Sequence, residues 1–112
     1  MGESTVKSDE FSASVFDPAD LLEYQDGAIV SKTVIDRDST TVTAFALDEG
    51  QRISEHTAPH DALLEVLDGT AHITINDTDF EVQAGEALIM PANEPHAVAA
   101  PSRFKMLLTM AR

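Results

Sequence analysis

The sequence predicts an all-β fold that closes into a barrel or a rolled sandwich. Short runs of β-branched and apolar residues recur at intervals of about ten residues, separated by turn-forming pairs such as Asp26-Gly27, Asp68-Gly69 and Asn76-Asp77. After Tyr24, no segment shows the period of an amphipathic helix. With this many short strands in 112 residues, closure of the sheet is the natural way to protect its edges.

The N-terminal end is expected to be a flexible acidic arm, residues 1–14, followed by one barrel domain, residues 15–112. The arm is rich in Ser, Glu, Asp and Lys and has few large apolar side chains that could pack. At the start of the domain we expect a short helical turn, because Asp17 can cap a helix that has Pro18 at its first position.

Nine strands are predicted after this turn. Alternation is clearest in residues 71–75, where Ala71, Ile73 and Ile75 share one face and His72 lies on the other. His72 is therefore expected to face solvent or an interface. The breaks between strands contain Gly, Asn or Asp, which tolerate positive φ. The predicted strands are 29–35, 41–47, 53–56, 62–67, 71–75, 80–82, 87–90, 96–99 and 104–110.

Charge and composition exclude several classes of partner. The formal net charge is −13, and the seven basic residues are scattered, so the clustered cations that bind nucleic acid or an anionic membrane are missing. The sequence has no cysteine, which excludes disulfides and thiolate metal sites. It shows neither an apolar run of about 20 residues nor a signal peptide. We expect a soluble, cytoplasmic protein.

The acidic surface predicts a response to salt. Twenty acidic residues against seven basic ones resemble the composition of a halophilic protein, although an ordinary acidic protein is the alternative. Because salt screens the repulsion between surface carboxylates, we expect the melting temperature to rise between dilute buffer and molar KCl. A flat or falling melting curve would remove the halophilic interpretation.

Three of the four histidines lie in two segments with regularly spaced Gly and Pro residues. Together the segments resemble the two motifs of the cupin superfamily, and the chain is similar to its small single-domain, conserved-barrel members. The resemblance implies a double-stranded β-helix (jelly-roll) cupin barrel, a cavity open at one end, commonly a divalent metal and frequently a homodimer. The positions that match with the required spacing are Gly50, His56, Gly69, Gly85, Pro91 and His96.

Two of the family's four metal-ligand positions are not filled. The second His position holds Ala58, and the Glu position holds Ala62 or Leu63. In a regular strand residues 56, 58 and 60 share a face, so His60 is a candidate substitute, although Pro59 is expected to distort the strand. The predicted metal ligands are therefore His56, His60 and His96, which would suit Zn, Fe, Mn, Ni or Cu.

The predicted function is that of a small stand-alone cupin that binds a divalent metal, a small organic ligand or both in the barrel. The alternatives are a metal-dependent oxygenase or isomerase, and a non-catalytic dimeric accessory protein. The sequence identifies no catalytic residues. A homodimer is expected through residues 29–35, because an exposed β-branched strand needs a partner and has no obvious place in the barrel. The alternative is that this strand folds back on the edge of its own barrel and the protein stays monomeric.

Overall fold

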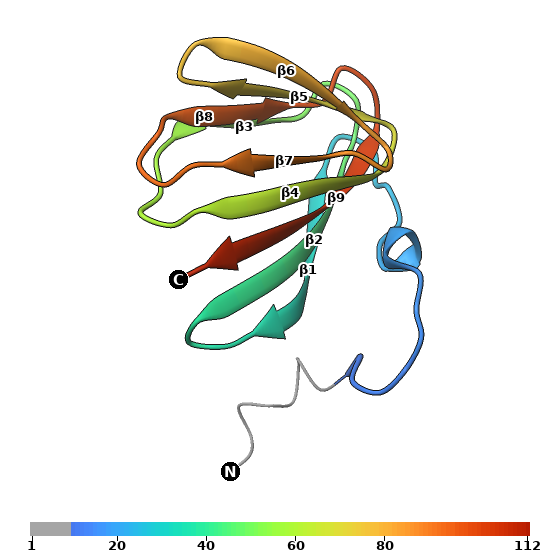
Figure 1. Cartoon of the computed structure of the whole chain (residues 1–112). Helices are drawn as coiled ribbons and strands as arrows, with labels where there is room; N and C mark the ends of the chain where they lie inside the picture. The colour runs from blue at the N-terminus through green and yellow to red at the C-terminus, as the bar shows by residue number, and fades with distance from the viewer. Residues whose placement is uncertain (1–9) are drawn as a thin grey trace.

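The computed structural model describes residues 10–112 and contains two antiparallel β-sheets that face each other (Figure 1). One sheet has five strands in the order β1-β2-β9-β4-β7, and the other has four in the order β3-β8-β5-β6. The strands are β1 (Ile29–Asp36), β2 (Thr40–Leu47), β3 (Arg52–His56), β4 (Ala62–Asp68), β5 (Thr70–Ile75), β6 (Thr78–Gln83), β7 (Ala87–Met90), β8 (His96–Ala99) and β9 (Phe104–Ala111). The predicted jelly-roll fold is confirmed, and the largest boundary error is at β6, which begins at Thr78 and not at Phe80.

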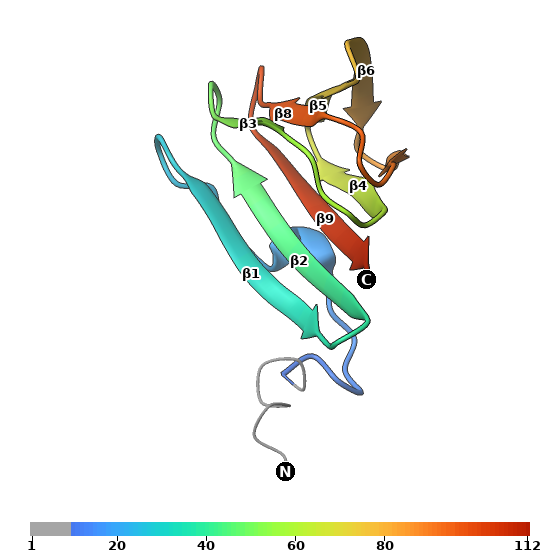
Figure 2. The same ribbon diagram turned by 90° about the vertical axis from the view of Figure 1, so that its left-hand side faces the viewer.

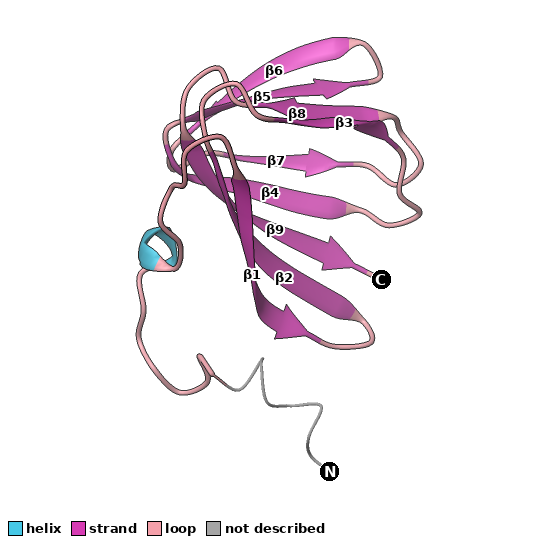
Figure 3. Cartoon of the chain, turned by 180° about the vertical axis from the view of Figure 1, so that it is seen from behind, coloured by secondary structure: helices cyan, strands magenta, loops and turns pink. Residues whose placement is uncertain are grey.

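Strand dominates the described chain, and the predicted helical turn is a short 3-10 helix, Pro18–Asp20 (Figure 3). Asp17 caps it as expected, since its carboxylate accepts a hydrogen bond from the Ala19 N–H at 3.0 Å. No helix within residues 10–112 is long and apolar enough to cross a membrane.

The predicted N-terminal arm falls partly outside the described residues, which exclude 1–9. Its last residues contact the domain. The Phe11 ring lies 5.0 Å from the Phe16 ring, centroid to centroid, and the Lys32 ammonium lies 5.5 Å from the centre of the Phe11 ring. Lys32 also pairs with Glu10 at 3.4 Å. The outer face of β1 is therefore in contact with residues 10–16.

The hydrophobic core lies between the sheets and follows the alternation of each strand. Its largest fully buried side chains come from both sheets, and all except Leu47, whose neighbour Ala46 is also buried, are flanked by more exposed neighbours along the strand, as is typical of a two-layer β structure. These side chains are Phe104, Leu47, Leu64, Ile73 and Met106. Burial of this apolar surface is the main favourable contribution to folding.

The strand at residues 29–35 has a place in the barrel: it pairs with the edge of its own sheet, as in the alternative above, and not as the preferred expectation had it. β1 pairs antiparallel with β2 along its whole length, with Ile29 opposite Leu47 and Asp36 opposite Thr41, and a register shift between Thr33 and Ile35. Figure 2 shows β1 as the outermost strand of the five-stranded sheet. One edge of β1 is therefore paired with β2, so a second protein chain is not needed there. The other edge of β1 is open within residues 10–112.

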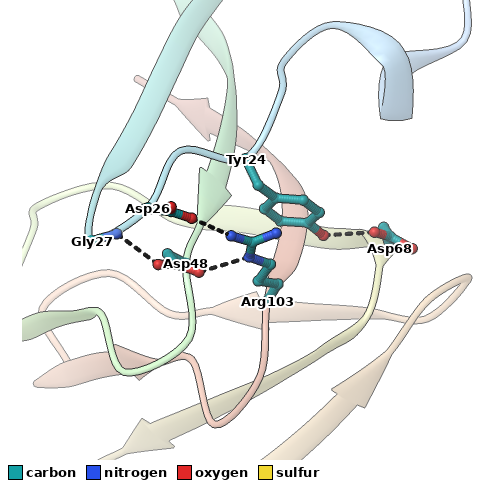
Figure 4. A network of polar contacts seen from close by, with 6 residues as sticks. All are labelled: Tyr24, Asp26, Gly27, Asp48, Asp68 and Arg103. Atoms are coloured by element: carbon teal, nitrogen blue, oxygen red, sulfur yellow. Dashed lines mark hydrogen bonds and ion pairs between the residues drawn. The ribbon is translucent and has the colours of Figure 1, made fainter.

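A polar network attaches the segment before β1 to the end of the barrel (Figure 4). Arg103 donates hydrogen bonds to Asp48 and Asp26, both at 2.7 Å, and Asp48 also accepts the Gly27 N–H. The Tyr24 hydroxyl donates to Asp68 at 2.6 Å, and burial, followed by this contact, raises the pKa of that hydroxyl. The network links the segment before β1 to residues at the ends of β2 and β4 and just before β9.

Asp48 makes this network sensitive to acid. The hydrogen bond from Arg103, followed by those from the backbone N–H groups of Gly27 and Glu49, lowers the pKa of Asp48 from 3.8 to about 2. Because the folded-state pKa is depressed, this contribution to stability is present above about pH 4 and is lost as the pH falls towards 2. We expect the stability difference between the wild type and Asp48→Asn, measured by urea denaturation, to shrink over that interval. A difference that does not change with pH would contradict this role for Asp48.

Candidate functional site

A cavity of about 340 Å³ lies between the two sheets, within the size range of small-molecule sites. Its walls come from six strands, four of the five-stranded sheet and two of the four-stranded sheet, and they are mostly apolar. The lining residues are Ile29, Phe45, Ile53, His56, Met90, His96, Val98, Met106 and Leu108. Two imidazoles are thus the only nitrogen- or oxygen-bearing side chains among the described residues that line the cavity.

His56 and His96 are brought together by strand pairing. His56 is the last residue of β3 and His96 the first of β8, and the two are directly opposite in the antiparallel register. Their ring centroids are 4.4 Å apart, with an interplanar angle of 68°, an edge-to-face arrangement. His96 is 6% exposed, whereas His56 is exposed, so His96 lies deeper and His56 nearer to solvent.

The backbone determines the tautomer of both rings. His56 Nδ1 lies 2.8 Å from the Ser54 carbonyl oxygen, and His96 Nδ1 lies 3.1 Å from the Glu94 carbonyl oxygen. A carbonyl oxygen only accepts, so each Nδ1 carries the proton. In a neutral imidazole the other nitrogen, Nε2, then has a free lone pair that can accept a hydrogen bond or bind a metal.

His60 is not brought to the same place. It lies in a bend after β3, is partly exposed, and is not among the residues that line the cavity. Residues 56, 58 and 60 would share a face if the strand continued through them. However, β3 ends at His56. His72 lies on the outer side of the four-stranded sheet, as predicted, and its Nε2 is 3.5 Å from Asp79.

The described residues make an incomplete metal site. Protein-bound transition metals generally take three or four protein ligands. Within residues 10–112, no group of three or more His, Asp or Glu side chains is arranged so that it could hold a metal ion. The described side chains therefore fit a metal only in part, through His56 and His96. A metal role for His56, His60 and His96 stays a prediction.

The loop before His96 is held against the segment that follows β3. The Asn93 N–H donates to the Ala58 carbonyl oxygen at 2.7 Å, and the Ala92 N–H donates to the Asp61 carboxylate at 2.8 Å. Asn93 has a φ of 66°, a conformation that Asn tolerates better than most residues, so it can occupy the position where the cupin motif has Gly. Ala58, at the unfilled second His position, thus lies beside the loop that carries His96.

Most of the apolar wall was not predicted as part of the site. Phe45 from β2 and Met106 and Leu108 from β9 come from outside the two histidine segments. The alternation in 104–110 could have indicated that Phe104, Met106 and Leu108 share the inward face. Which of them meet the histidines depends on pairing between strands distant in sequence.

Comparisons with known proteins agree with this architecture. The model of the Cupin domain family matches residues 44–110, more than half of the chain. A search of the curated proteins found no match.

Solved structures extend the likeness beyond the matched segment. A conserved protein of unknown function from Streptococcus pyogenes is 36% identical, with a TM-score of 0.85 over 89% of this chain and 88% of that one. A cupin 2 conserved barrel domain protein from Leptotrichia buccalis is 40% identical, with a TM-score of 0.81 over 84% of this chain and 46% of that one. A salicylate 1,2-dioxygenase variant from Pseudoaminobacter salicylatoxidans shares the fold alone. It is 11% identical, with a TM-score of 0.69 over 74% of this chain and 26% of that one.

With its two matching histidine segments, its jelly-roll barrel and this family match, the chain belongs to the cupin family.

Proposed function

We propose that this protein binds a small, mainly apolar organic molecule in the cavity between its sheets, with His56 and His96 as the polar contacts. One observation carries the proposal: a cavity of about 340 Å³ whose apolar walls converge on a pair of imidazoles. A largely preformed apolar cavity with a few polar groups is the usual form of a small-molecule site.

A cavity-filling variant tests this proposal. Ile53 lines the cavity and is only partly buried, so Ile53→Phe should occupy the binding volume at moderate cost to folding. We expect small aromatic molecules to raise the melting temperature of the wild type and to leave that of Ile53→Phe unchanged, because only binding to the native state stabilises it. Phe80→Leu, on β6 outside the cavity lining, is the control. Equal shifts in all three proteins would contradict binding in this cavity.

A divalent metal is the second candidate, supported by the lone pairs of His56 and His96 and by the family's usual chemistry. When bound, such an ion would supply Lewis-acid or redox chemistry to a metal-dependent oxygenase or isomerase. Because two imidazoles are a partial ligand set, we expect protein purified without a histidine tag to contain clearly less than one metal ion per chain. Stoichiometric Zn, Fe, Mn, Ni or Cu would favour the enzyme over the organic-ligand binder.

We also propose that the protein forms a homodimer through the open edge of β1, the arrangement in which it would serve as an accessory protein. Ile29 and Ile35 are 39% and 40% exposed on this edge strand. Ile35→Glu leaves the core intact, unlike a change at Val34, which is 6% exposed. Light scattering at molar salt should give about twice the 12.1 kDa chain mass for the wild type and a single chain mass for Ile35→Glu. A wild-type mass of one chain would refute the dimer.

A further inference from the structure

We infer that the molecule bound in the cavity carries an uncharged hydrogen-bond donor, which it directs to Nε2 of His56 or His96 if it is a hydroxyl and to either or both if it is an amino group. The inference rests on the proposed function and adds the chemistry of the ligand's polar end. It starts from the hydrogen bonds of the two rings and from the absence of other polar side chains in the described lining.

Both rings offer the cavity an acceptor and no donor. The N–H of each ring is at Nδ1, where it is used by the carbonyl oxygen of the residue two positions earlier, Ser54 or Glu94. The only ring nitrogen left for a ligand is therefore Nε2, which in the neutral ring accepts hydrogen bonds. With centroids 4.4 Å apart, the rings can serve a single polar group. A ligand without a donor would leave these acceptors unsatisfied, which weakens binding.

A negatively charged head group does not match this lining. A carboxylate or phosphate only accepts hydrogen bonds, so it would face the lone pairs of Nε2 with no donor between them. Among the described lining residues there is no Lys or Arg that could compensate an anion. The net charge of −13 repels anions from the molecule as a whole.

A positively charged head group does not match either. Burial of an ammonium ion in an apolar cavity requires a paired carboxylate, and no Asp or Glu is among the described residues of the lining. The overall negative charge attracts cations to the surface, but it does not replace a buried counter-ion. An uncharged donor on an apolar body matches the walls and can donate to at least one of the two acceptors.

The walls also restrict the rest of the ligand. Seven of the nine lining side chains are Ile, Val, Leu, Phe or Met. Met90 and Met106, which are 3% and 0% exposed, place polarizable thioethers in the wall, where they form favourable contacts with aromatic rings. A phenol with a short alkyl chain is therefore a suitable probe.

The test compares molecules that share one apolar body and differ only in the polar group. Para-ethylphenol donates a hydrogen bond, para-ethylanisole has a methyl in place of that proton, and para-ethylbenzoate is an anion. Binding is measured by titration calorimetry with the full chain at about pH 8. We expect the phenol to bind on the order of ten-fold more tightly than its methyl ether, and the benzoate to bind most weakly.

A ring-preserving substitution assigns the effect to the imidazole. The double variant His56→Phe/His96→Phe keeps both aromatic rings and removes both acceptors, so affinity for the phenol should fall to the level of the ether, while affinity for the ether stays within about two-fold. If the double variant folds poorly, the two single variants repeat the test, and at least one of them should lower the affinity for the phenol. His72→Phe, outside the cavity, should change neither affinity.

Each result has a definite meaning. Equal affinities for phenol and ether, tighter binding of the benzoate, or long-range ¹H–¹⁵N spectra that place the proton on Nε2 would overturn the inference while the proposed function stands. No binding of any of the three molecules would overturn the proposed function and the inference with it. A preference for the phenol that is lost in the double variant His56→Phe/His96→Phe supports both.

Discussion

Replacement of Gly69 by alanine is expected to lower the free energy of unfolding by about 3 kcal/mol or more. Gly69 joins β4 to β5 with a φ of +76°, and an added Cβ would overlap the Arg103 carbonyl oxygen and press on Phe104, whose side chain is fully buried. A left-handed conformation costs an L-residue roughly 1–2 kcal/mol. The forced backbone shift adds roughly 1–3 kcal/mol, as overpacking of a core does.

Gly50 provides a matched control for this substitution. It has a similar φ of +86°, but a Cβ there would meet no atom within 4 Å, so Gly50→Ala tests the backbone conformation alone. We expect this variant to lose only about 1–2 kcal/mol by urea denaturation. Equal losses for the two variants would show that the close approach of β9 to Gly69 has no energetic importance.

Restoring the family's missing histidine is expected to convert the partial site into a metal site. Ala58 lies beside the loop that carries His96, through the hydrogen bond from the Asn93 N–H. In Ala58→His a third imidazole would join His56 and His96. The free energy of zinc binding at a structural site with four ligands is about 10–16 kcal/mol. Each ligand thus contributes roughly 3 kcal/mol, which corresponds to ~100-fold in affinity. We therefore expect Ala58→His to bind Zn²⁺ at least ~10-fold more tightly than the wild type.

Thr57→His is the control for this gain. It introduces the same side chain one residue earlier, at a position that is exposed, whereas Ala58 is partly buried. Competition titrations with a chromogenic chelator should show no comparable gain for Thr57→His, and the gain of Ala58→His should disappear when His96 is also changed to Ala. If Thr57→His matched Ala58→His, the added affinity would come from a surface histidine and not from this site.

Local chemistry in the sequence predicted the turns and strands well. Gly27, Gly50, Gly69 and Gly85 all take positive φ at the predicted breaks, because these positions require a conformation that glycine adopts without strain. The Asn76-Asp77 turn behaves in the same way, with φ of 48° and 71°. Such signals depend on one or two residues, so a single sequence contains them.

The site was predicted less completely, because it depends on contacts between distant strands. The spacing around His56 and His96 identified the pair that strand pairing brings together. It could not show that β3 ends at His56, and hence that His60 would fall in a bend. The place of β1 beside β2 was predicted only as the less favoured alternative, since edge pairing depends on the whole sheet and not on the strand's own residues.

The central claim, that His56 and His96 are the polar end of an apolar ligand cavity, is tested most directly by a crystal structure of the complex with para-ethylphenol. We expect the ring of the ligand between the two sheets, against Met106, with its hydroxyl within hydrogen-bonding distance of Nε2 of His56 or His96. A ligand bound instead in the surface cleft beside His72 and Arg52, with the space between the sheets empty, would contradict the account.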